Sequence, residues 1–173
     1  MKRSFAVAAV IVLILLLSGC AGGKEPEVSL FSREKTVGKD ILMEDITDFY
    51  YTEENINFNA HYQRYRFYVE NGKYMFFHET RDRAGDYGWC TEEDTTAIGT
   101  LELTGEQWSA FYDLVCGGTV TARKDNADAG DSGPWYYLYW KNDGDKYQVY
   151  AFDSYDTEKK FVEYCLTLVP LCD

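Results

Sequence analysis

The sequence is poor in positive charge, in histidine and in long apolar runs, and each shortage excludes a class of protein. Lysine and arginine number 17 against 29 aspartates and glutamates, so the formal net charge is −12. Nucleic-acid binding needs a basic surface, and so does lying flat on anionic lipid, so we expect neither. The histidines are His61 and His78 alone, and no Cys-x-x-Cys pair occurs, so a zinc site has no support.

The apolar run at the N-terminus is too short to span a membrane comfortably. It covers thirteen uncharged residues, Phe5 to Leu17, and follows the basic pair Lys2 and Arg3. A spanning helix needs about 20 apolar residues, whereas a basic start followed by a shorter apolar region is typical of a signal peptide. The run ends in Leu17-Ser18-Gly19-Cys20.

This N-terminal pattern resembles the lipobox of bacterial lipoproteins. The resemblance implies that residues 1–19 are removed and that Cys20 is lipidated and becomes the new N-terminus. We therefore expect an outward-facing protein held to the cell membrane by its lipid, since two acyl chains are enough for stable anchoring. Without Lys2 and Arg3 the net charge would be about −14. The alternative is an ordinary secretory signal with an incidental cysteine.

The rest of the chain predicts a tether and one domain. Residues 20–43 begin with a small, polar, aperiodic stretch, Ala21 to Pro26. About 20 flexible residues would span roughly 25 Å. Residues 44–173 have the length of one ordinary domain, and an aromatic content of 17% in the chain argues against disorder there.

The clearest local signal is Asn71-Gly72 between two apolar runs, which predicts a β-hairpin over residues 63–79. Closing the chain there pairs Glu70 with Lys73 and Arg64 with Glu79, two opposite charges in each case. One face then carries Tyr65, Phe67, Val69, Tyr74, Phe76 and His78. This face predicts a structural core rather than a site.

Further elements follow from capping and periodicity. Thr104 and Gln107 have capping-box spacing and predict a helix that Gly117-Gly118 ends. Ser154 or Asp156 is expected to cap a second helix. Asp143-Gly144 predicts a hairpin over residues 135–152 with Tyr137 opposite Tyr150. We also expect strands at 46–51, 98–103 and 119–122, and long loops at 81–96 and 123–134.

Together these elements predict an α+β fold, an antiparallel sheet of about six or seven strands with two helices packed on one face. Each helix follows a hairpin, which suggests an internal duplication of ββα type. Cys90, Cys116, Cys165 and Cys172 remain after Cys20. They are either free thiols or disulfides, and Cys116–Cys165 is the favoured pair if both helices share a face.

The aromatic strip of the second hairpin is the main candidate for a ligand face. Trp135, Tyr137, Tyr139 and Tyr150 are expected on one side of the sheet, where they could stack on sugars or grip a peptide. Burial under helices explains the same residues. No catalytic set, cofactor or metal is predicted. Asp125, Asp128 and Asp131 resemble a calcium loop, but the EF-hand spacing is absent, so we favour a solvated acidic loop.

The body of the chain resembles small uncharacterised lipoproteins of anaerobic Gram-positive bacteria in three segments: Asp86-Tyr87-Gly88, Leu103 to Trp108, and Gly130 to Trp135. That resemblance implies a location and no chemistry. We predict a non-catalytic cell-surface domain that binds a ligand or an envelope partner, either a protein or a glycan. One alternative is a hydrolase of cell-wall or glycan substrates that uses His61 with loop carboxylates such as Glu92, Glu93 and Asp94. Another is a structural or inhibitory envelope protein.

Overall fold

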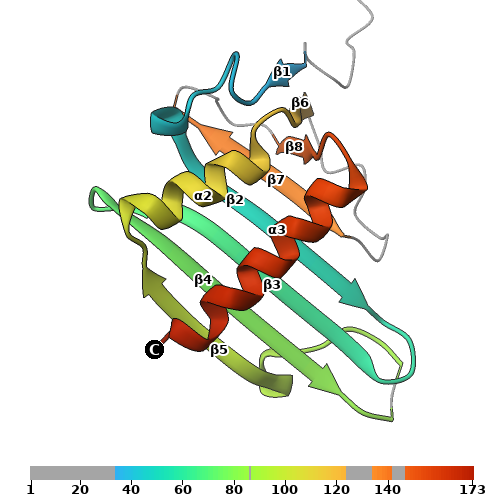
Figure 1. Ribbon diagram of the computed structural model, residues 1–173. Helices are drawn as coiled ribbons and strands as arrows, with labels where there is room; N and C mark the ends of the chain where they lie inside the picture. The colour runs from blue at the N-terminus through green and yellow to red at the C-terminus, as the bar shows by residue number, and fades with distance from the viewer. Residues whose placement is uncertain (1–33, 86, 124–133, 142–146) are drawn as a thin grey trace, which may run out of the picture.

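The computed structural model describes residues 34–85, 87–123, 134–141 and 147–173, and within them the fold is a single twisted sheet with two helices across one face (Figure 1). The sheet has eight strands, one or two more than predicted, in the order β1-β6-β8-β7-β2-β3-β4-β5. All of its strand pairs are antiparallel. The predicted α+β class is therefore confirmed, whereas the internal duplication stays a prediction.

The strands are β1 (Lys35–Thr36), β2 (Ile46–Asn55), β3 (Ala60–Glu70), β4 (Lys73–Arg83), β5 (Thr95–Glu102), β6 (Thr119–Arg123), β7 (Trp135–Trp140) and β8 (Tyr147–Ala151). The helices are α2 (Gly105–Val115) and α3 (Tyr155–Leu168). Short 3-10 turns are η1 (Met43–Asp45), η2 (Glu92–Asp94) and η3 (Val169–Leu171). The predicted loop at 81–96 is thus shortened at both ends by strands.

The first hairpin has the predicted register at every position. Asn71 and Gly72 have φ angles of 53° and 78°, as the tight turn between β3 and β4 requires. Glu70 partners Lys73, and Arg64 partners Glu79. Its core face is buried at Tyr65, Phe67, Phe76 and His78. The hairpin is then extended on both sides, by β2 and by β5, into a four-stranded meander.

Both helices begin at the caps that the sequence indicates. The Thr104 side chain accepts a hydrogen bond from the Gln107 amide, and the Gln107 side chain accepts one from the Thr104 amide. The Ser154 side chain caps α3 by accepting from the Thr157 amide. Both helices cross the same face of the sheet (Figure 1). The helix α2 connects β5 to β6, and α3 follows β8.

The core lies between the helices and the sheet and is mainly aromatic. The Phe67 ring stacks on Phe111 of α2 with the centroids 4.2 Å apart. Phe49 of β2 contacts Phe111 and Phe161 edge-on at 5.5 and 5.2 Å. Tyr74 stacks on Trp108 at 4.4 Å. Successive side chains of a strand point to opposite faces of the sheet. The strand residues between these core residues therefore point to the face that the helices leave uncovered.

Some residues that the sequence analysis assigned to the tether are packed against the domain. Val37 and Ile41 are 1% and 0% exposed and belong to the core. The Val37 amide donates to the Gly118 carbonyl, and β1 pairs with β6 at the sheet edge. Apolar side chains at these two positions are buried, so the domain includes residues from about 35 onward rather than from 44. No helix in the described ranges has both the length and the hydropathy to cross a bilayer.

Candidate functional site

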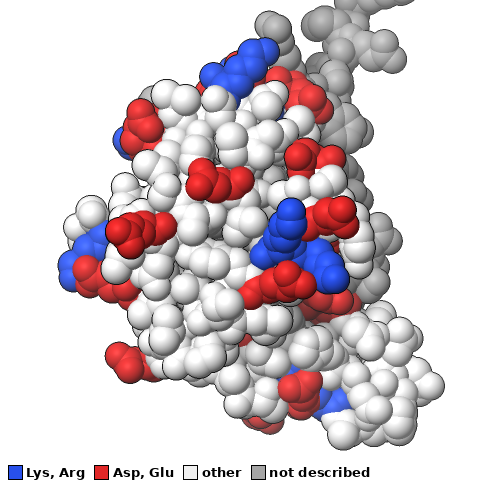
Figure 2. Space-filling model, in the orientation of Figure 1, with Lys and Arg blue, Asp and Glu red and all other residues white. Residues whose placement is uncertain are grey.

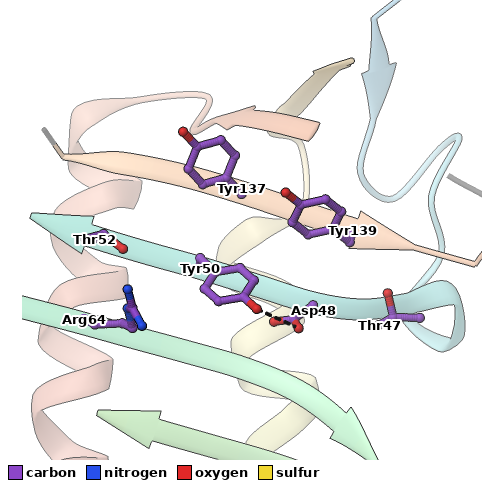
Figure 3. A pocket seen from close by; sticks show the side chains of 7 residues that line it. All are labelled: Thr47, Asp48, Tyr50, Thr52, Arg64, Tyr137 and Tyr139. Atoms are coloured by element: carbon purple, nitrogen blue, oxygen red, sulfur yellow. Dashed lines mark hydrogen bonds between the residues drawn. The ribbon is translucent and has the colours of Figure 1, made fainter. Parts of the chain in front are cut away.

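The face of the sheet opposite the helices carries a hollow of about 510 Å³ over β7, β2 and β3 (Figure 3). Apart from Thr47, which lies where the pairing of β2 with β7 is irregular, its lining residues alternate along each strand, so their side chains project to the same side. They are Thr47, Asp48, Tyr50 and Thr52 of β2, Arg64 of β3, and Tyr137 and Tyr139 of β7. The other face of the sheet, which the helices cover, carries scattered acidic side chains and fewer basic ones (Figure 2).

The register of the three strands arranges these side chains in rows. Tyr50 is the Cα partner of Tyr137 on one side and of Arg66 on the other. Two residues further along β2, Thr52 lies between Trp135 and Arg64 in the same way. Threonine is much smaller than its two neighbours, so this row leaves space above the sheet. The hollow therefore follows from strand pairing and from the size of one side chain.

Tyrosine rings form the apolar part of the hollow. The rings of Tyr50 and Tyr139 meet edge to face, with centroids 6.2 Å apart and planes at 88°. Tyr137 projects beside them from β7 (Figure 3). All three are half-buried, so each ring is held by its neighbours and still offers surface. A tyrosine ring combines an apolar body with a polar end, which suits a ligand with both kinds of surface.

A hydrogen-bonded ion pair fixes one end of the hollow. Arg66 donates from Nε to both carboxylate oxygens of Asp48, at 3.0 and 3.2 Å, and from a terminal nitrogen at 2.5 Å. The Tyr50 hydroxyl donates to the same carboxylate at 3.2 Å. The hydrogen bond to Asp48 raises the pKa of Arg66, and burial with the nearby Asp48 charge raises the pKa of Tyr50. Asp48 is thus a charge already neutralised by Arg66.

Arg64 at the other end has no such partner. Among the described residues, no carboxylate oxygen lies within 4.0 Å of its guanidinium. Its Nε is buried and makes no hydrogen bond within the described part of the chain. Its guanidinium carbon lies 5.4 Å from the centroid of the Tyr62 ring, a cation–π distance. Glu79 partners Arg64 across the strands, but its carboxylate binds Arg81 at 2.6 Å.

The structure brings together three of the four residues predicted for a ligand face. Tyr137 and Tyr139 line the hollow, and Trp135 lies on the same side next to Thr52. Tyr150 lies on the opposite side, where it is 2% exposed and donates to the Val115 carbonyl at 3.0 Å. The cause is a register difference of one residue, because Tyr137 pairs with Val149 rather than with Tyr150.

The sequence did not indicate Asp48, Tyr50 or Arg64 as site residues. Arg64 was assigned to the polar face of the first hairpin, which is correct. What was missing is that β7 lies beside β2 and brings its tyrosines to that face. The alternation of Asp48, Tyr50 and Thr52 with buried Phe49 and Tyr51 is a signal that these residues share one face.

One carboxylate of the predicted loop at 81–96, Asp82, lies beside a histidine, whereas Glu92, Glu93 and Asp94 have no histidine partner among the described residues. His61 Nδ1 lies 2.7 Å from Asp82, and this hydrogen bond lowers the pKa of Asp82. Asp94 instead accepts from the Thr91 amide in η2, which lowers its pKa. His78 is buried, which lowers its pKa. A hydrolase needs a carboxyl group with a raised pKa beside its partner, and Glu92 to Asp94 with His61 do not form that arrangement.

The cysteines of the described chain are all free thiols. Cys165 is buried in the last turn of α3, and Cys116 is exposed just beyond the end of α2. Both are free thiols, so the pairing suggested for them is not formed in this structure. Burial raises the pKa of Cys90, Cys165 and Cys172, whereas a nucleophilic thiol needs a lowered one. The described residues contain no cluster of three metal-binding side chains. Asp125, Asp128 and Asp131 lie outside the described residues.

A second aromatic group lies in the loops at one end of the sheet. Phe58 and Tyr87 have ring centroids 6.1 Å apart, and they are 55% and 75% exposed. Trp89 is 53% exposed. These loops are joined by a hydrogen bond from the Gly88 amide to the Ile56 carbonyl at 2.9 Å. The Arg83 guanidinium donates to the Tyr87 carbonyl at 3.1 Å in the same loop.

Comparison with known proteins adds no relative. No protein-family model, curated protein or solved structure matches the chain. Any functional conclusion therefore depends on the residues and their geometry.

Proposed function

We propose that this chain is a lipid-anchored, outward-facing binding domain, held to the cell membrane through Cys20, and that it binds its ligand in the hollow on the open sheet face. The observation that carries the binding role is the half-buried group of Tyr50, Tyr137 and Tyr139 beside Arg64, whose guanidinium has no carboxylate partner among the residues that the structure describes. Ligand sites are concave, largely apolar and aromatic, with a few polar groups that fix orientation. The hollow has these properties.

The anchoring part of the proposal is supported by the basic start, the apolar run and the Leu17-Ser18-Gly19-Cys20 segment. A tether from Cys20 to about residue 34 would hold the acidic domain off an anionic membrane surface, which repels it. Lipidation is tested by feeding an alkyne fatty acid to a Gram-positive host that expresses the full chain. The wild type is expected to be labelled in the membrane fraction, and a Cys20→Ala variant to be unlabelled. An unlabelled wild type would refute the anchor.

The binding role is tested on the mature domain with an array of glycans and peptides. We compare the wild type with a double variant, Tyr137→Ala with Tyr139→Ala, which removes the apolar wall of the hollow. The matched control is Tyr155→Ala, because Tyr155 is 75% exposed at the start of α3 and lies on the helical side. The proposal requires at least one array signal that the double variant loses and the control keeps. Signals that survive the double variant would place binding elsewhere.

The arrangement of the loops supports a non-catalytic role over the hydrolase alternative. The carboxylates Glu92 to Asp94 belong to η2, whereas His61 is bound to Asp82. Within the hollow, the one carboxylate is Asp48, and Arg66 neutralises it.

A further inference from the structure

The charge count of the open face indicates which ligand it would take. We propose that the hollow binds a saccharide unit that carries a single carboxylate, with the carboxylate on the Arg64 guanidinium and the sugar ring against Tyr50 and Tyr137. This inference rests on the proposed binding role and names the chemical class of the ligand.

Among the residues that line the hollow, Arg64 is the positive charge that has no carboxylate partner within the described chain. Arg83, further along the same face, also has no such partner, but it donates to the Tyr87 carbonyl and does not line the hollow. The Arg66 charge is neutralised by Asp48, at 2.5 Å, and the Arg81 charge by Glu79, at 2.6 Å. Within the hollow, one guanidinium without a carboxylate partner in the described ranges matches one carboxylate on the ligand. A polyanion would meet a chain with a net charge of −12, and repulsion would oppose its approach. The ligand therefore carries one local negative charge rather than a series of them.

The guanidinium of Arg64 is held in place before any ligand binds. Its Nε is buried, and the Tyr62 ring lies 5.4 Å from its guanidinium carbon. Tyr62 is itself 7% exposed, so this support is rigid. A guanidinium donates two parallel hydrogen bonds to a carboxylate in a fixed geometry. Since Arg64 loses little side-chain freedom on binding, more of the interaction energy appears as affinity.

A sugar fits this face better than a peptide strand does. Peptides that bind sheets add to an edge, where main-chain groups are free. The hollow lies over β7, β2 and β3, which are internal strands whose main-chain groups pair with neighbours on both sides. Binding must therefore use side chains: tyrosine rings for the apolar side of a pyranose, and the hydroxyls of Thr47 and Thr52 with Asp48 Oδ1 for its hydroxyl groups.

The spacing of the rows agrees with a carboxylate attached directly to a sugar ring. Arg64 lies in the row of Thr52, and the next row along β2 holds Tyr50 and Tyr137. Two residues along a strand cover about 7 Å. A uronic acid that places its carboxylate in the first row puts its ring over the second. The rows from Asp48 to Thr52 extend about 13 Å, which leaves room for a neighbouring unit.

The experiment uses two trisaccharides that differ at one position, one ending in glucuronic acid and the other in glucose. Dissociation constants are measured with the mature domain by NMR titration. The wild type is expected to bind the glucuronic acid ligand about tenfold or more tightly than the glucose ligand, as a charge-assisted bidentate contact provides. Arg64→Gln should remove that difference. Arg64→Lys, which keeps the charge and loses the fork, should retain part of it.

The control variant is Lys160→Gln. It changes the net charge by the same amount as Arg64→Gln, at an exposed position of α3. It should keep the full preference for glucuronic acid. Each variant is compared with the wild type by circular dichroism, so that loss of folding is recognised directly. The dependence of the preference on salt provides a second measurement, since an ion pair weakens as salt is added.

Four results would overturn the inference. The wild type could bind both trisaccharides with equal affinity, and the Tyr137→Ala and Tyr139→Ala double variant could lose that binding. This result would support the binding role but would show that a carboxylate on the ligand does not contribute to affinity. Binding to neither trisaccharide, or a glucuronic acid preference that persists in Arg64→Gln, would also refute it, and the binding role would then be judged on the array alone. Polygalacturonate that binds more tightly per carboxylate than the trisaccharide would refute the single-charge argument.

Discussion

Replacement of Phe67 by alanine is expected to destabilise the domain more than a typical core substitution does. The Phe67 side chain is fully buried. Its ring stacks on Phe111 of α2 at 4.2 Å and contacts Phe76 and Phe161 at 4.9 and 5.8 Å. Truncating a buried phenylalanine costs about 3–5 kcal/mol. Aromatic pairs add about 0.5–1.5 kcal/mol each beyond buried area, so we expect a loss of about 4–5 kcal/mol.

The assay is equilibrium unfolding in urea, followed by tryptophan fluorescence and far-UV circular dichroism. Ordinary domains have about 5–15 kcal/mol of stability, so Phe67→Ala is expected to move the midpoint far toward zero urea at an unchanged slope. If the variant is already unfolded in buffer, Phe67→Leu gives a measurable case. That variant keeps most of the apolar volume and is expected to lose about 1.5 kcal/mol.

Phe58→Ala is the matched control, because the same atoms are removed from a ring that is 55% exposed. We expect it to change the free energy of unfolding by less than about 1 kcal/mol. A cost of under about 2 kcal/mol for Phe67→Ala, or equal costs for the two variants, would mean that the helices do not pack on this face of the sheet as described.

Three further predictions concern stability. Thr104→Ala removes the side chain that accepts from the Gln107 amide and should lower the free energy of unfolding by about 1 kcal/mol. Gly99→Ala places a methyl carbon 2.8 Å from Cys172 Cβ and 3.1 Å from the Asp173 carbonyl oxygen, so the C-terminal segment must shift and the unfolding midpoint should fall. Burial lowers the pKa of His78 from 6.5. The unfolded chain therefore binds a proton at His78 at a higher pH than the folded chain, so stability should fall as the pH drops below about 6.5, and less steeply in His78→Asn.

Each of these has a control. Gly105→Ala should leave stability nearly unchanged, because no atom lies within 4 Å of the added methyl group. For the cap, Thr104→Ser should retain most of the stability that alanine loses. If His78→Asn shows the same dependence on pH between about 5 and 7 as the wild type, another group is responsible for it.

Local signals predicted the first hairpin and both helix starts because their physical causes are local. The positive φ angles at Asn71 and Gly72 fix the turn, and the turn fixes every pair between β3 and β4. The caps at Thr104 and Ser154 likewise need only three or four neighbouring residues. Alternation of polar and apolar residues was enough to place Phe67 in the core and Arg64 on the opposite face.

The second hairpin and the candidate site could not be predicted fully from such local signals. The turn was expected at Asp143-Gly144, which lies outside the described residues, and the pairing of Tyr137 with Val149 differs by one residue from the expected one. A shift of one residue exchanges the two faces, and for that reason Tyr150 was assigned to the wrong side. The hollow also depends on β7 lying beside β2, and no turn or cap between them encodes that contact.

The pairing of β2 with β7 has a consequence for how the chain reaches its native state. Phe49 partners Leu138 across almost ninety residues of sequence, so the meander of β2 to β5 can form while one edge of β2 is still open. An open edge rich in Ile, Phe and Tyr is a template for association between chains. Glu53 and Glu54 lie on this strand, and acidic side chains of this kind oppose association between open edges before β7 pairs with β2. Neutralising these acidic side chains should therefore slow productive refolding and increase aggregation at high protein concentration, even where the folded domain tolerates the change.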